Sequence, residues 1–575
     1  MKPWQHITAL LLLAGTLFFL ELGTLGLTDV DEGNNAEAAR EMLESGDWIS
    51  PTFHYEPRWK KPIFNYWLIS LSYRVFGVNE FAARLPAASF GVMLALLQYL
   101  FLSRIRGTSV GFLGALMLVF NVEILAIGHM VIHDSALIFF TTLSLFALWF
   151  GLNGQGTQRS FLWLFYVGIG LGVLTKGPIG VLVPLLVAAS YILLTRRVSQ
   201  FWHQGFPILG TLVSLSLALP WYIAMSMLHG WQYWNAAYPE MAGRFFATLE
   251  GHGGTVFFYL PVLLIGYFPW SGFLPAALYD TFKTWWDHRG TAAAATVDRG
   301  DDLEFFAGIW VVVVFVFFSL SSTRLLHYIG PLFPAASILV ACYWKRSMGG
   351  PMTSWFRGAI HTIMITGYLM GLALASAPLL YAKFVDKIAR EFPMAHQVDL
   401  GPSPIACGAI LVVGSALVGY FGLSEKRRYG AVWAAGATIG LTLFVGLKLG
   451  LPQFATYFIA PPQQLAYIAG LNLKPEDQFI CYESFRPSLI FYAKRKAVIV
   501  HAGQEERMTP YLKQPGRTMI LLPTRLRSKL PGEAVSYPVL LERYGYSLVA
   551  NEPMVNVPPS AERSPASMVG PHGKL

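Results

Sequence analysis

The stretch HITALLLLAGTLFFLELGTLGLTDVDEGNNAEAAREMLESGDW, residues 6–48, joins a long apolar run to a segment rich in carboxylates. The apolar part, residues 6–27, is long enough to cross the roughly 30 Å hydrocarbon core of a membrane as a helix. A signal peptide has a shorter apolar region of about 7–15 residues and a small-residue cleavage site, and we find no clear site here. We therefore interpret this run as an uncleaved first span, with its carboxylates at the membrane exit.

Apolar runs of similar length recur along the chain. Of its 575 residues 54% are hydrophobic and only 13% are charged, whereas soluble domains carry about 25% charged residues. The composition predicts a polytopic α-helical membrane protein with about thirteen transmembrane helices. The predicted spans are 6–27, 82–103, 109–128, 132–152, 161–175, 177–194, 205–226, 255–278, 305–321, 325–344, 357–381, 403–423 and 430–447.

The charge of the loops orients these spans. Each loop that would be cytoplasmic with the N-terminus inside carries at least one Lys or Arg, as the positive-inside rule requires. An odd number of spans then places the first large loop, 28–81, and the C-terminal region together on the outer side of the membrane. Much of the formal net charge of +9 lies in these short loops, so it is not a sign of nucleic-acid binding.

The C-terminal region has a different character. DQFICYES, KAVIVHAG and RTMILLPT are rich in β-branched and aromatic residues and predict short strands, with helical patterns near 486–494 and 503–513. We predict a transmembrane domain over 1–449 and a small soluble α/β domain on the outer side of the membrane over 450–555. The remaining residues, 556–575, are rich in Pro, Ser and Gly and predict a disordered tail.

The first loop begins with an amphipathic pattern. NNAEAAREMLESG, residues 34–46, predicts a helix capped near Asn34, with an Arg40–Glu44 pair and a stop at Gly46. Its apolar face predicts a helix lying on the membrane surface. On this interpretation the glutamates of the helix form a solvated face.

Asp29, Asp31 and Glu32 come just before this predicted helix. They are open to two interpretations. Carboxylates there complement the helix dipole, or one of them is a general base held at the outer membrane face, where an enzyme would meet a lipid-linked substrate.

A basic cluster follows in YEPRWKKPIFNYW, residues 55–67. Arg58, Lys60 and Lys61 stand among Tyr and Trp residues, which favour the headgroup level of a membrane. The cluster would suit either anionic lipid headgroups or the phosphate of a lipid-linked donor.

Later outer turns add further ionisable groups. They occur in GHMVIHDSA, LTKGPIG, YPEMAGRFFATLEGHGG and STRLLHYIGPLFP, and comprise His129, His133, Asp134, Lys176, Arg244, His252, Arg324 and His327, with Tyr328 beside them. Each residue alone is more often solvated than catalytic. Because successive turns bring them to one membrane face, where ionisable groups are functional candidates, the joint pattern indicates a site.

DVDEGNNAEAAREMLESGDW, KKPIFNYWL and GVNEFAARLPAA resemble the start of bacterial GT-C glycosyltransferases, which use sugars on polyprenyl phosphate and are related to protein O-mannosyltransferases. The most similar branch is the aminoarabinose transferases that modify lipid A. HDSAL, LTKGP, EGHGG and SSTRLLHYIGPLFP continue the resemblance in the same order, over residues 1–345.

The resemblance implies a GT-C fold in a bacterial inner membrane, with the C-terminal domain in the periplasm. It also implies transfer of a sugar at the periplasmic face, with inversion, from undecaprenyl phosphate to an acceptor such as lipid A. It implies catalytic roles for Asp31, Glu32 and Asp134. It also implies a set of residues around the donor phosphate: Lys61, Lys176, Arg244, Arg324 and Tyr328. The basic cluster itself adds Arg58 and Lys60 as further candidates for binding that phosphate.

One departure concerns a metal. The aminoarabinose transferases usually have Glu-Lys-Pro where this chain has Lys60-Lys61-Pro62. That glutamate and a histidine matching His252 are associated with a bound metal in that branch, so the lysine argues against a metal site here and against aminoarabinose as the sugar. We therefore expect no required cofactor, with His252 a ligand only if a metal is present.

Other functions stay open. A protein O-mannosyltransferase-like enzyme would share the donor chemistry. A transporter or flippase of a lipid-linked substrate would instead place its polar groups near the bilayer midplane. A membrane protein whose C-terminal domain does the binding is the third alternative. Besides membrane lipids, the expected partners are a polyprenyl-phosphate-linked sugar donor and an acceptor that is lipid A, another glycan, a lipid or a protein.

Overall fold

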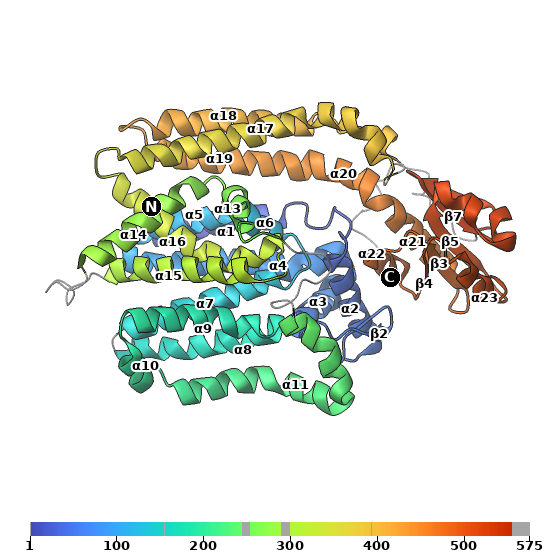
Figure 1. Cartoon of the computed structure of the whole chain (residues 1–575), viewed down its shortest axis with the longest axis horizontal. Coiled ribbons are helices and arrows are strands. Elements are labelled where there is room, and N and C mark those ends of the chain that lie inside the picture. The colour runs from blue at the N-terminus through green and yellow to red at the C-terminus, as the bar shows by residue number, and fades with distance from the viewer. Residues whose placement is uncertain are drawn as a thin grey trace.

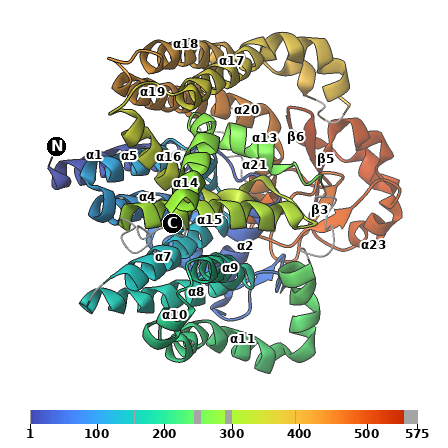
Figure 2. The ribbon, with the colours of Figure 1, turned by 60° about the vertical axis from the view of Figure 1, so that its left-hand side comes forward.

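The computed structural model describes residues 2–154, 156–243, 254–288, 299–390, 392 and 394–554. Most of the chain is helical, and the helices run side by side in three layers with a small sheet domain beyond one end (Figure 1). Figure 2 shows the same layers after a turn of 60°.

The middle layer contains the largest apolar core, in which Trp149 and Trp310 are fully buried. In it α1 packs on α4 and α5, and α5 packs on α16. Asn121 interrupts one apolar run, because its side chain accepts a hydrogen bond from the Ile124 amide and starts a new helix. The helices are α1 (Pro3–Phe19), α4 (Glu80–Arg106), α5 (Thr108–Val119), α6 (Val122–Gly128), α13 (Tyr259–Gly266), α14 (Leu274–His288), α15 (Arg299–Leu320) and α16 (Phe333–Ser347).

A second layer is attached through α7 (Asp134–Asn153), which packs on both α4 and α8. Gly177, at a φ of +67° that few other residues adopt, ends α8 and leaves Lys176 as the last residue of that helix. The layer contains α8 (Leu162–Lys176), α9 (Ile179–Leu194), α10 (Val198–Gln204) and α11 (Pro207–Tyr238).

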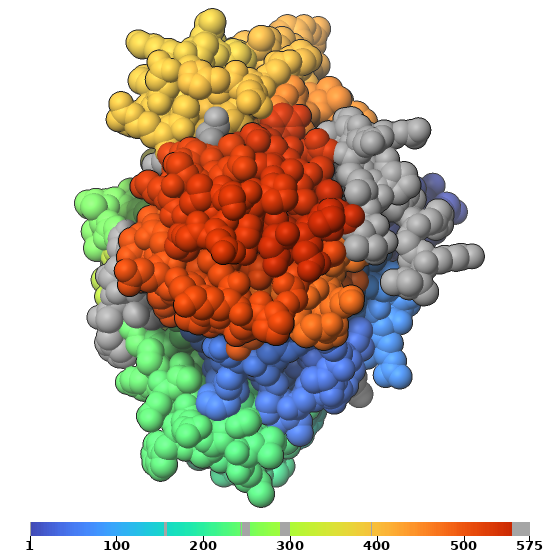
Figure 3. All heavy atoms as spheres, turned by 90° about the vertical axis from the view of Figure 1, so that its right-hand side faces the viewer, coloured from blue at the N-terminus to red at the C-terminus, as the bar shows by residue number. Residues whose placement is uncertain are grey.

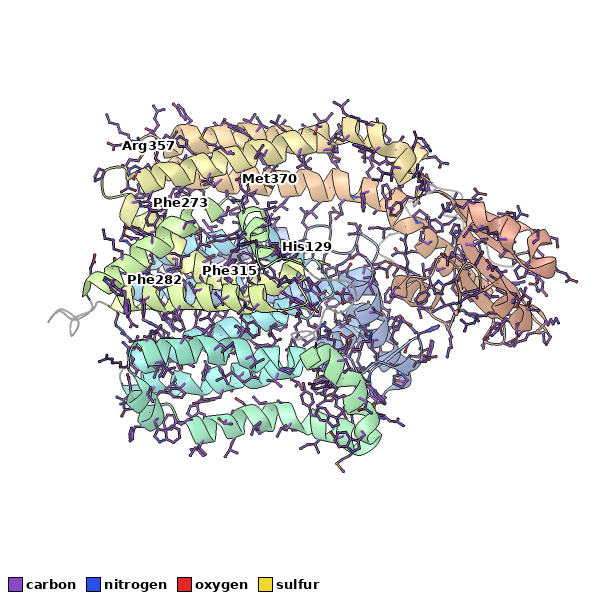
Figure 4. All side chains as sticks on the ribbon, viewed as in Figure 1. His129, Phe273, Phe282, Phe315, Arg357 and Met370 are labelled. Carbon is purple, nitrogen blue, oxygen red and sulfur yellow. The ribbon has the colours of Figure 1, made fainter. Side chains whose placement is uncertain are left out.

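The third layer joins the middle layer at the end far from the sheet domain. Phe273, which Figure 4 labels at that end, contacts Trp344 and Phe356, with ring centroids 4.6 and 5.2 Å apart. The layer contains α17 (Ser354–Ile388), α18 (Ser403–Gly422), α19 (Tyr429–Val445) and α20 (Leu451–Phe458).

Each of the thirteen predicted spans falls on a helix or on a bent pair of helices. Within the described residues eight helices are long and apolar enough to cross a membrane, or ten if each of two bent pairs is one span. Bends of 64° between α5 and α6 and of 120° between α13 and the α14 region explain part of the difference, because a broken helix has no single long apolar segment. The exact number of spans stays a prediction.

The first loop folds differently from the expected surface helix. It contains α2 (Asp31–Ser45), β1 (Thr52–Phe53), β2 (Glu56–Pro57) and α3 (Phe64–Phe76). The expectation that α2 begins near Asn34 is wrong: it begins at Asp31, whose carboxylate and that of Glu32 lie in the first turn, where they complement the helix dipole. The stop at Gly46 is confirmed, with a φ of +72°.

The expected solvated face of α2 is also wrong for two of its three glutamates. Glu37 and Glu41 are buried, and only Glu44 is exposed. Arg40 pairs with Glu37 at 2.7 Å and with Glu44 at 2.9 Å. Glu41 accepts hydrogen bonds from the Thr52 hydroxyl at 2.6 Å and the Tyr55 amide at 3.0 Å. The β1–β2 hairpin thus covers a face that helical periodicity alone assigns to solvent, and burial raises the pKa of Glu37 to about 7 despite Arg40.

The C-terminal domain contains the three predicted strands and two that were not predicted. Its sheet has the order β4-β3-β5-β7-β6, with β4, β3 and β5 parallel and β7 and β6 antiparallel. The helix Tyr429–Phe458, which contains α19 and α20, runs through the predicted boundary at 449, and the division of the chain into domains stays a prediction. The elements are α21 (Ala460–Asn472), β3 (Gln478–Tyr482), α22 (Pro487–Ala493), β4 (Val498–Val500), α23 (Thr509–Leu512), β5 (Thr518–Pro523), β6 (Val539–Arg543) and β7 (Tyr546–Ala550).

This domain covers one end of the helical layers. In the space-filling view from that end it lies in front, and atoms of the first loop emerge below it (Figure 3). The contact is direct, because α22 packs against α2. The predicted disordered tail, 556–575, lies outside the described residues.

Candidate active site

The start of α2 presents one carboxylate to open space and buries the next. Asp31 is exposed, whereas Glu32 is 1% exposed. Asn35 follows Asp31 by four residues and therefore lies on the same face of the helix. Its amide donates to the Val131 carbonyl at 2.8 Å, which fixes α2 against the turn that precedes α7.

Glu32 connects α2 to the membrane helices. Both of its oxygens accept from the Arg84 guanidinium at 2.8 Å, and one accepts from the Val131 amide at 2.9 Å. Thr28 donates both its amide and its hydroxyl. Burial alone would raise the pKa of Glu32, but Arg84 and Thr28 outweigh it and hold the pKa below its usual value. Glu32 is thus a buried anchor and does not line the cavity described below.

Asp134, the first residue of α7, is the centre of a second group. Its carboxylate accepts from the Lys176 ammonium at 2.6 Å and lies 3.7 Å from Nε2 of His327, in the 3-10 helix η5 (Leu326–Leu332). The Lys176 ammonium also lies 4.6 Å from the ring centroid of Tyr328. Three turns that are far apart in the sequence therefore meet at this carboxylate.

These groups line a small cavity that is open to solvent. Its lining includes two carboxylates, those of Asp31 and Asp134, and two ammonium groups, those of Lys61 and Lys176. The lining residues are Asp31, Asn35, Lys61, Ile132, His133, Asp134, Lys176, Leu325, His327 and Tyr328.

Five residues implied by the resemblance therefore lie together: Asp31, Lys61, Asp134, Lys176 and Tyr328. The other described candidates do not line this cavity, and each has its own contacts. Arg58 donates to the Tyr66 hydroxyl at 3.3 Å and Lys60 pairs with Glu240 at 3.5 Å. Arg324 donates to the carbonyls of Gly254 and Ser319.

Arg244 and His252 lie outside the described residues. Within the described residues no group of three or more His, Cys, Asp or Glu side chains is arranged to hold a metal ion. The expectation of a metal-independent site therefore stays a prediction.

The cavity also contains polar residues that were not assigned a role from the sequence. His133 and His327 belong to outer turns already singled out there. Asn35 was missed, because its relation to Asp31 is evident only if the helix begins at Asp31. His129, labelled in Figure 4, does not line the cavity: it lies beside Phe18, with ring centroids 6.5 Å apart.

Comparison with known proteins agrees with this architecture. The family model described as dolichyl-phosphate-mannose-protein mannosyltransferase matches residues 8–234. A crystal structure of ArnT from Cupriavidus metallidurans bound to undecaprenyl phosphate has a TM-score of 0.74 at 22% identity, covering 95% of this chain and 98% of that chain. The protein thus has the GT-C fold of this membrane protein.

The family is shown by two curated relatives, both named undecaprenyl phosphate-alpha-4-amino-4-deoxy-L-arabinose arabinosyl transferase. The relative from Pseudomonas paraeruginosa (strain DSM 24068 / PA7) is 31% identical over 77% of this chain and 76% of its own length. The relative from Pseudomonas aeruginosa PAO1 is 31% identical over 79% of this chain and 77% of its own length. The chain belongs to this family of arabinosyl transferases.

Proposed function

We propose that this protein transfers a sugar from undecaprenyl phosphate to a lipid or glycan acceptor, such as lipid A, at the periplasmic face of a bacterial inner membrane. The observation that carries the proposal is the cavity in which Asp31, Lys61, Asp134 and Lys176 meet. Its mixture of two ammonium and two carboxylate groups suits a phosphate leaving group beside an acceptor that loses a proton. The names of the curated relatives support the donor.

In this proposal Lys61 and Lys176 bind the donor phosphate. As the bond between the sugar and the phosphate breaks, negative charge develops on the phosphate, and fixed cations in a partly dry site stabilise it. Asp134 holds the Lys176 ammonium at 2.6 Å and so fixes its position while offsetting part of its charge.

Asp31 is the proposed general base. Its carboxylate is exposed at the start of α2 and lines the cavity. It would accept the proton of an acceptor hydroxyl as the oxygen attacks the sugar from the face opposite the phosphate, which inverts the anomeric centre. If the acceptor is a phosphate, no proton needs to be removed, and Asp31 would orient the acceptor.

The remaining candidates have supporting roles in this proposal. Glu32 positions Asp31 through its contacts with Arg84 and Val131. Arg58 and Lys60, beside the cavity residue Lys61, would attract the anionic headgroup to the site, and Arg324 would fix the chain next to His327. Arg244, which lies outside the described residues, stays a candidate phosphate ligand implied by the resemblance.

The sugar itself is the finer question. The relatives are named for a pentose, 4-amino-4-deoxy-L-arabinose, which makes it the first donor to test. Lys60 stands where the aminoarabinose transferases have a glutamate, so donors that carry a hexose should be tested as well. The match of residues 8–234 to a mannosyltransferase model makes a protein hydroxyl the second candidate acceptor.

The test is an in vitro transfer assay with purified protein in nanodiscs. Undecaprenyl-phosphate donors carrying labelled aminoarabinose or hexoses would be offered with lipid A, membrane extract or protein acceptors. We expect transfer by the wild type and a loss of roughly a hundredfold or more in the Asp31→Asn variant. Asp47→Asn is the matched control, because Asp47 is exposed in the same loop but does not line the cavity.

Each result has a distinct meaning. If the Asp31→Asn variant still transfers sugar, Asp31 is not the general base, but the protein is still a glycosyltransferase. Absence of transfer from every donor by folded wild-type protein would contradict the proposal and favour a transporter of a lipid-linked substrate.

A further inference from the structure

We propose that the C-terminal domain positions the catalytic loop, and that Ser488 and Asp29 are positioning residues which hold Asp31 at the cavity. This inference rests on the proposed function, since it assigns Asp31 as the base. Neither Ser488 nor Asp29 lines the cavity, so both would act through the backbone that carries Asp31.

The central contact is a pair of hydrogen bonds across 459 residues of sequence. The Asp29 carboxylate accepts from the Ser488 amide at 2.8 Å with one oxygen and from the Ser488 hydroxyl at 2.6 Å with the other. Ser488 is fully buried in α22. Hydrogen bonds to a charged acceptor are among the stronger ones in proteins, and this pair lies two residues before Asp31.

A second contact fixes the same segment at Leu27. The Leu27 amide donates to the Tyr492 hydroxyl at 3.0 Å, and the Leu27 carbonyl accepts from the Gln463 side chain at 2.6 Å. Gln463 also donates to the Ser488 hydroxyl at 3.0 Å. Both backbone groups of Leu27 are therefore bonded to the C-terminal domain, through side chains that belong to α21 and α22.

The close approach of α22 to α2 depends on glycine. A Cβ atom at Gly33 would lie 2.4 Å from the Ser488 amide nitrogen, and one at Gly26 would lie 2.2 Å from the Gln463 side-chain oxygen. The Gly33 contact is with backbone, which cannot rotate away as a side chain can. Any larger residue at Gly33 would therefore separate the two helices.

Asp31 thus stands between two anchors. On one side Glu32 is bonded to Arg84 of the membrane helix α4, and on the other Asp29 is bonded to Ser488 of the C-terminal domain. The backbone that carries the Asp31 carboxylate is therefore held on both sides. Because a misplacement of about 1 Å can lower a rate by roughly a hundredfold, this double anchoring is expected to affect kcat more than donor binding.

The test compares Ser488→Ala and Asp29→Ala with Ser484→Ala. Ser484 is a buried serine of the same domain, but its hydroxyl donates to the Leu521 carbonyl within that domain. We expect Ser488→Ala to lower kcat roughly tenfold and Asp29→Ala further, with KM for the donor within about twofold of the wild type. Asp29→Asn keeps an acceptor for the Ser488 amide and a polar partner for its hydroxyl, so it should retain most of kcat.

A second measurement does not depend on turnover. Hydrogen–deuterium exchange of residues 27–35 should be faster in Ser488→Ala and Asp29→Ala than in Ser484→Ala. Gly33→Ala should show the same increase, whereas Gly15→Ala, where an added Cβ meets nothing within 4 Å, should not.

The outcomes separate this inference from the proposed function. An unchanged kcat in Ser488→Ala and Asp29→Ala, or an equal loss of kcat in Ser484→Ala, would overturn the positioning role. Transfer by the wild type would still support the proposed function. If the wild type transfers no sugar, the proposed function fails, and the exchange measurement alone decides whether the C-terminal domain orders residues 27–35. Equal exchange in all the serine variants would then overturn that ordering.

Discussion

Asp31 and Glu32 are adjacent carboxylates with opposite surroundings. Asp31 is exposed at the cavity, while Glu32 is buried against Arg84. Helical geometry produces this difference, because successive residues of a helix point about 100° apart. One carboxylate can therefore face a substrate while its neighbour anchors the helix.

The first prediction at this scale concerns Glu32 and stability. Glu32→Gln leaves the buried Arg84 without its counter-charge, and breaking a buried pair in this way costs about 3–5 kcal/mol. Because Arg84 lowers the pKa of Glu32 below 4.5, the pair contributes stability above that pH and loses it as the pH falls through the folded-state pKa. Thermal unfolding of the wild type and Glu32→Gln at neutral pH would measure the destabilisation, and the same comparison near pH 4 would show whether it becomes smaller.

The control is Glu44→Gln, because Glu44 also pairs with an arginine but its side chain is 51% exposed. This variant should change stability by less than about 1 kcal/mol. Equal destabilisation in the two variants would show that the buried Glu32–Arg84 pair has no special weight.

The second residue-scale prediction separates Lys61 from its neighbour. Lys61→Ala should weaken binding of undecaprenyl phosphate by about 1.5–3 kcal/mol, the usual worth of a hydrogen bond to a charged group. Lys60→Ala should have a much smaller effect, because Lys60 pairs with Glu240 and does not line the cavity. The shift of the unfolding temperature with added undecaprenyl phosphate measures both, and equal losses would contradict the assignment.

At the scale of elements, the sequence predicted whether a segment is a helix or a strand better than it predicted which faces of that element are buried. The helix of the first loop and the strands β3, β4 and β5 all lie where composition predicted them. The burial of α2 was not predicted, because its covering comes from the β1–β2 hairpin and from α22, more than 400 residues later in the chain. The β6–β7 hairpin was missed because its turn is Tyr544-Gly545, both at positive φ, and not the usual Asn-Gly or Asp-Gly.

The β1–β2 hairpin gives a prediction about pH. Nε2 of His54 accepts a hydrogen bond from the Ala497 amide at 2.9 Å, which only the neutral ring can do. Burial, and then the nearby Lys496, lower the pKa of His54 below 6.5. Its contribution to docking of the C-terminal domain is therefore present above pH 6.5 and is lost as the pH falls through the folded-state pKa.

We expect the difference in unfolding temperature between the wild type and His54→Gln to change between about pH 7.5 and pH 5.5, because a histidine titrates near this range and a glutamine does not. The stability of the wild type should decline relative to that of the variant as the pH falls. His203→Gln, which alters an exposed histidine on α10, should show no such change. A constant difference between the wild type and His54→Gln would contradict the role of this hydrogen bond.

For the whole molecule, sequence reasoning identified several residues of the cavity but not the contacts that bring them together. Asp31, Lys61, Asp134 and Lys176 were all candidates from the resemblance and the outer turns, and the structure brings them together. Sequence reasoning could not tell that Arg58 and Lys60 lie outside the cavity, because the direction of a side chain at a turn depends on tertiary contacts. Asn35 was missed for a local reason, the misplaced start of α2.

The orientation of the molecule is the last prediction. Arg106 follows the second predicted span and Arg346 the tenth, so both lie in loops expected to be cytoplasmic, and both bond to Glu304 at 2.6 Å. Arg346 also bonds to Asp280 at 2.7 Å, two residues from Phe282, which Figure 4 labels at the end of the layers away from the C-terminal domain. If the positive-inside rule holds for this chain, the end with these arginines is cytoplasmic.

Single cysteines at the two ends test this directly, because the native Cys342, Cys407 and Cys481 are all buried. Ser536→Cys places a thiol on the exposed surface of the C-terminal domain, and Ser199→Cys places one on α10, beside Arg196 and Arg197. In intact spheroplasts a membrane-impermeant maleimide should label the first and spare the second, while permeabilised cells should show both labelled. The reverse pattern would place the cavity on the cytoplasmic side, where the proposed periplasmic acceptor could not reach Asp31.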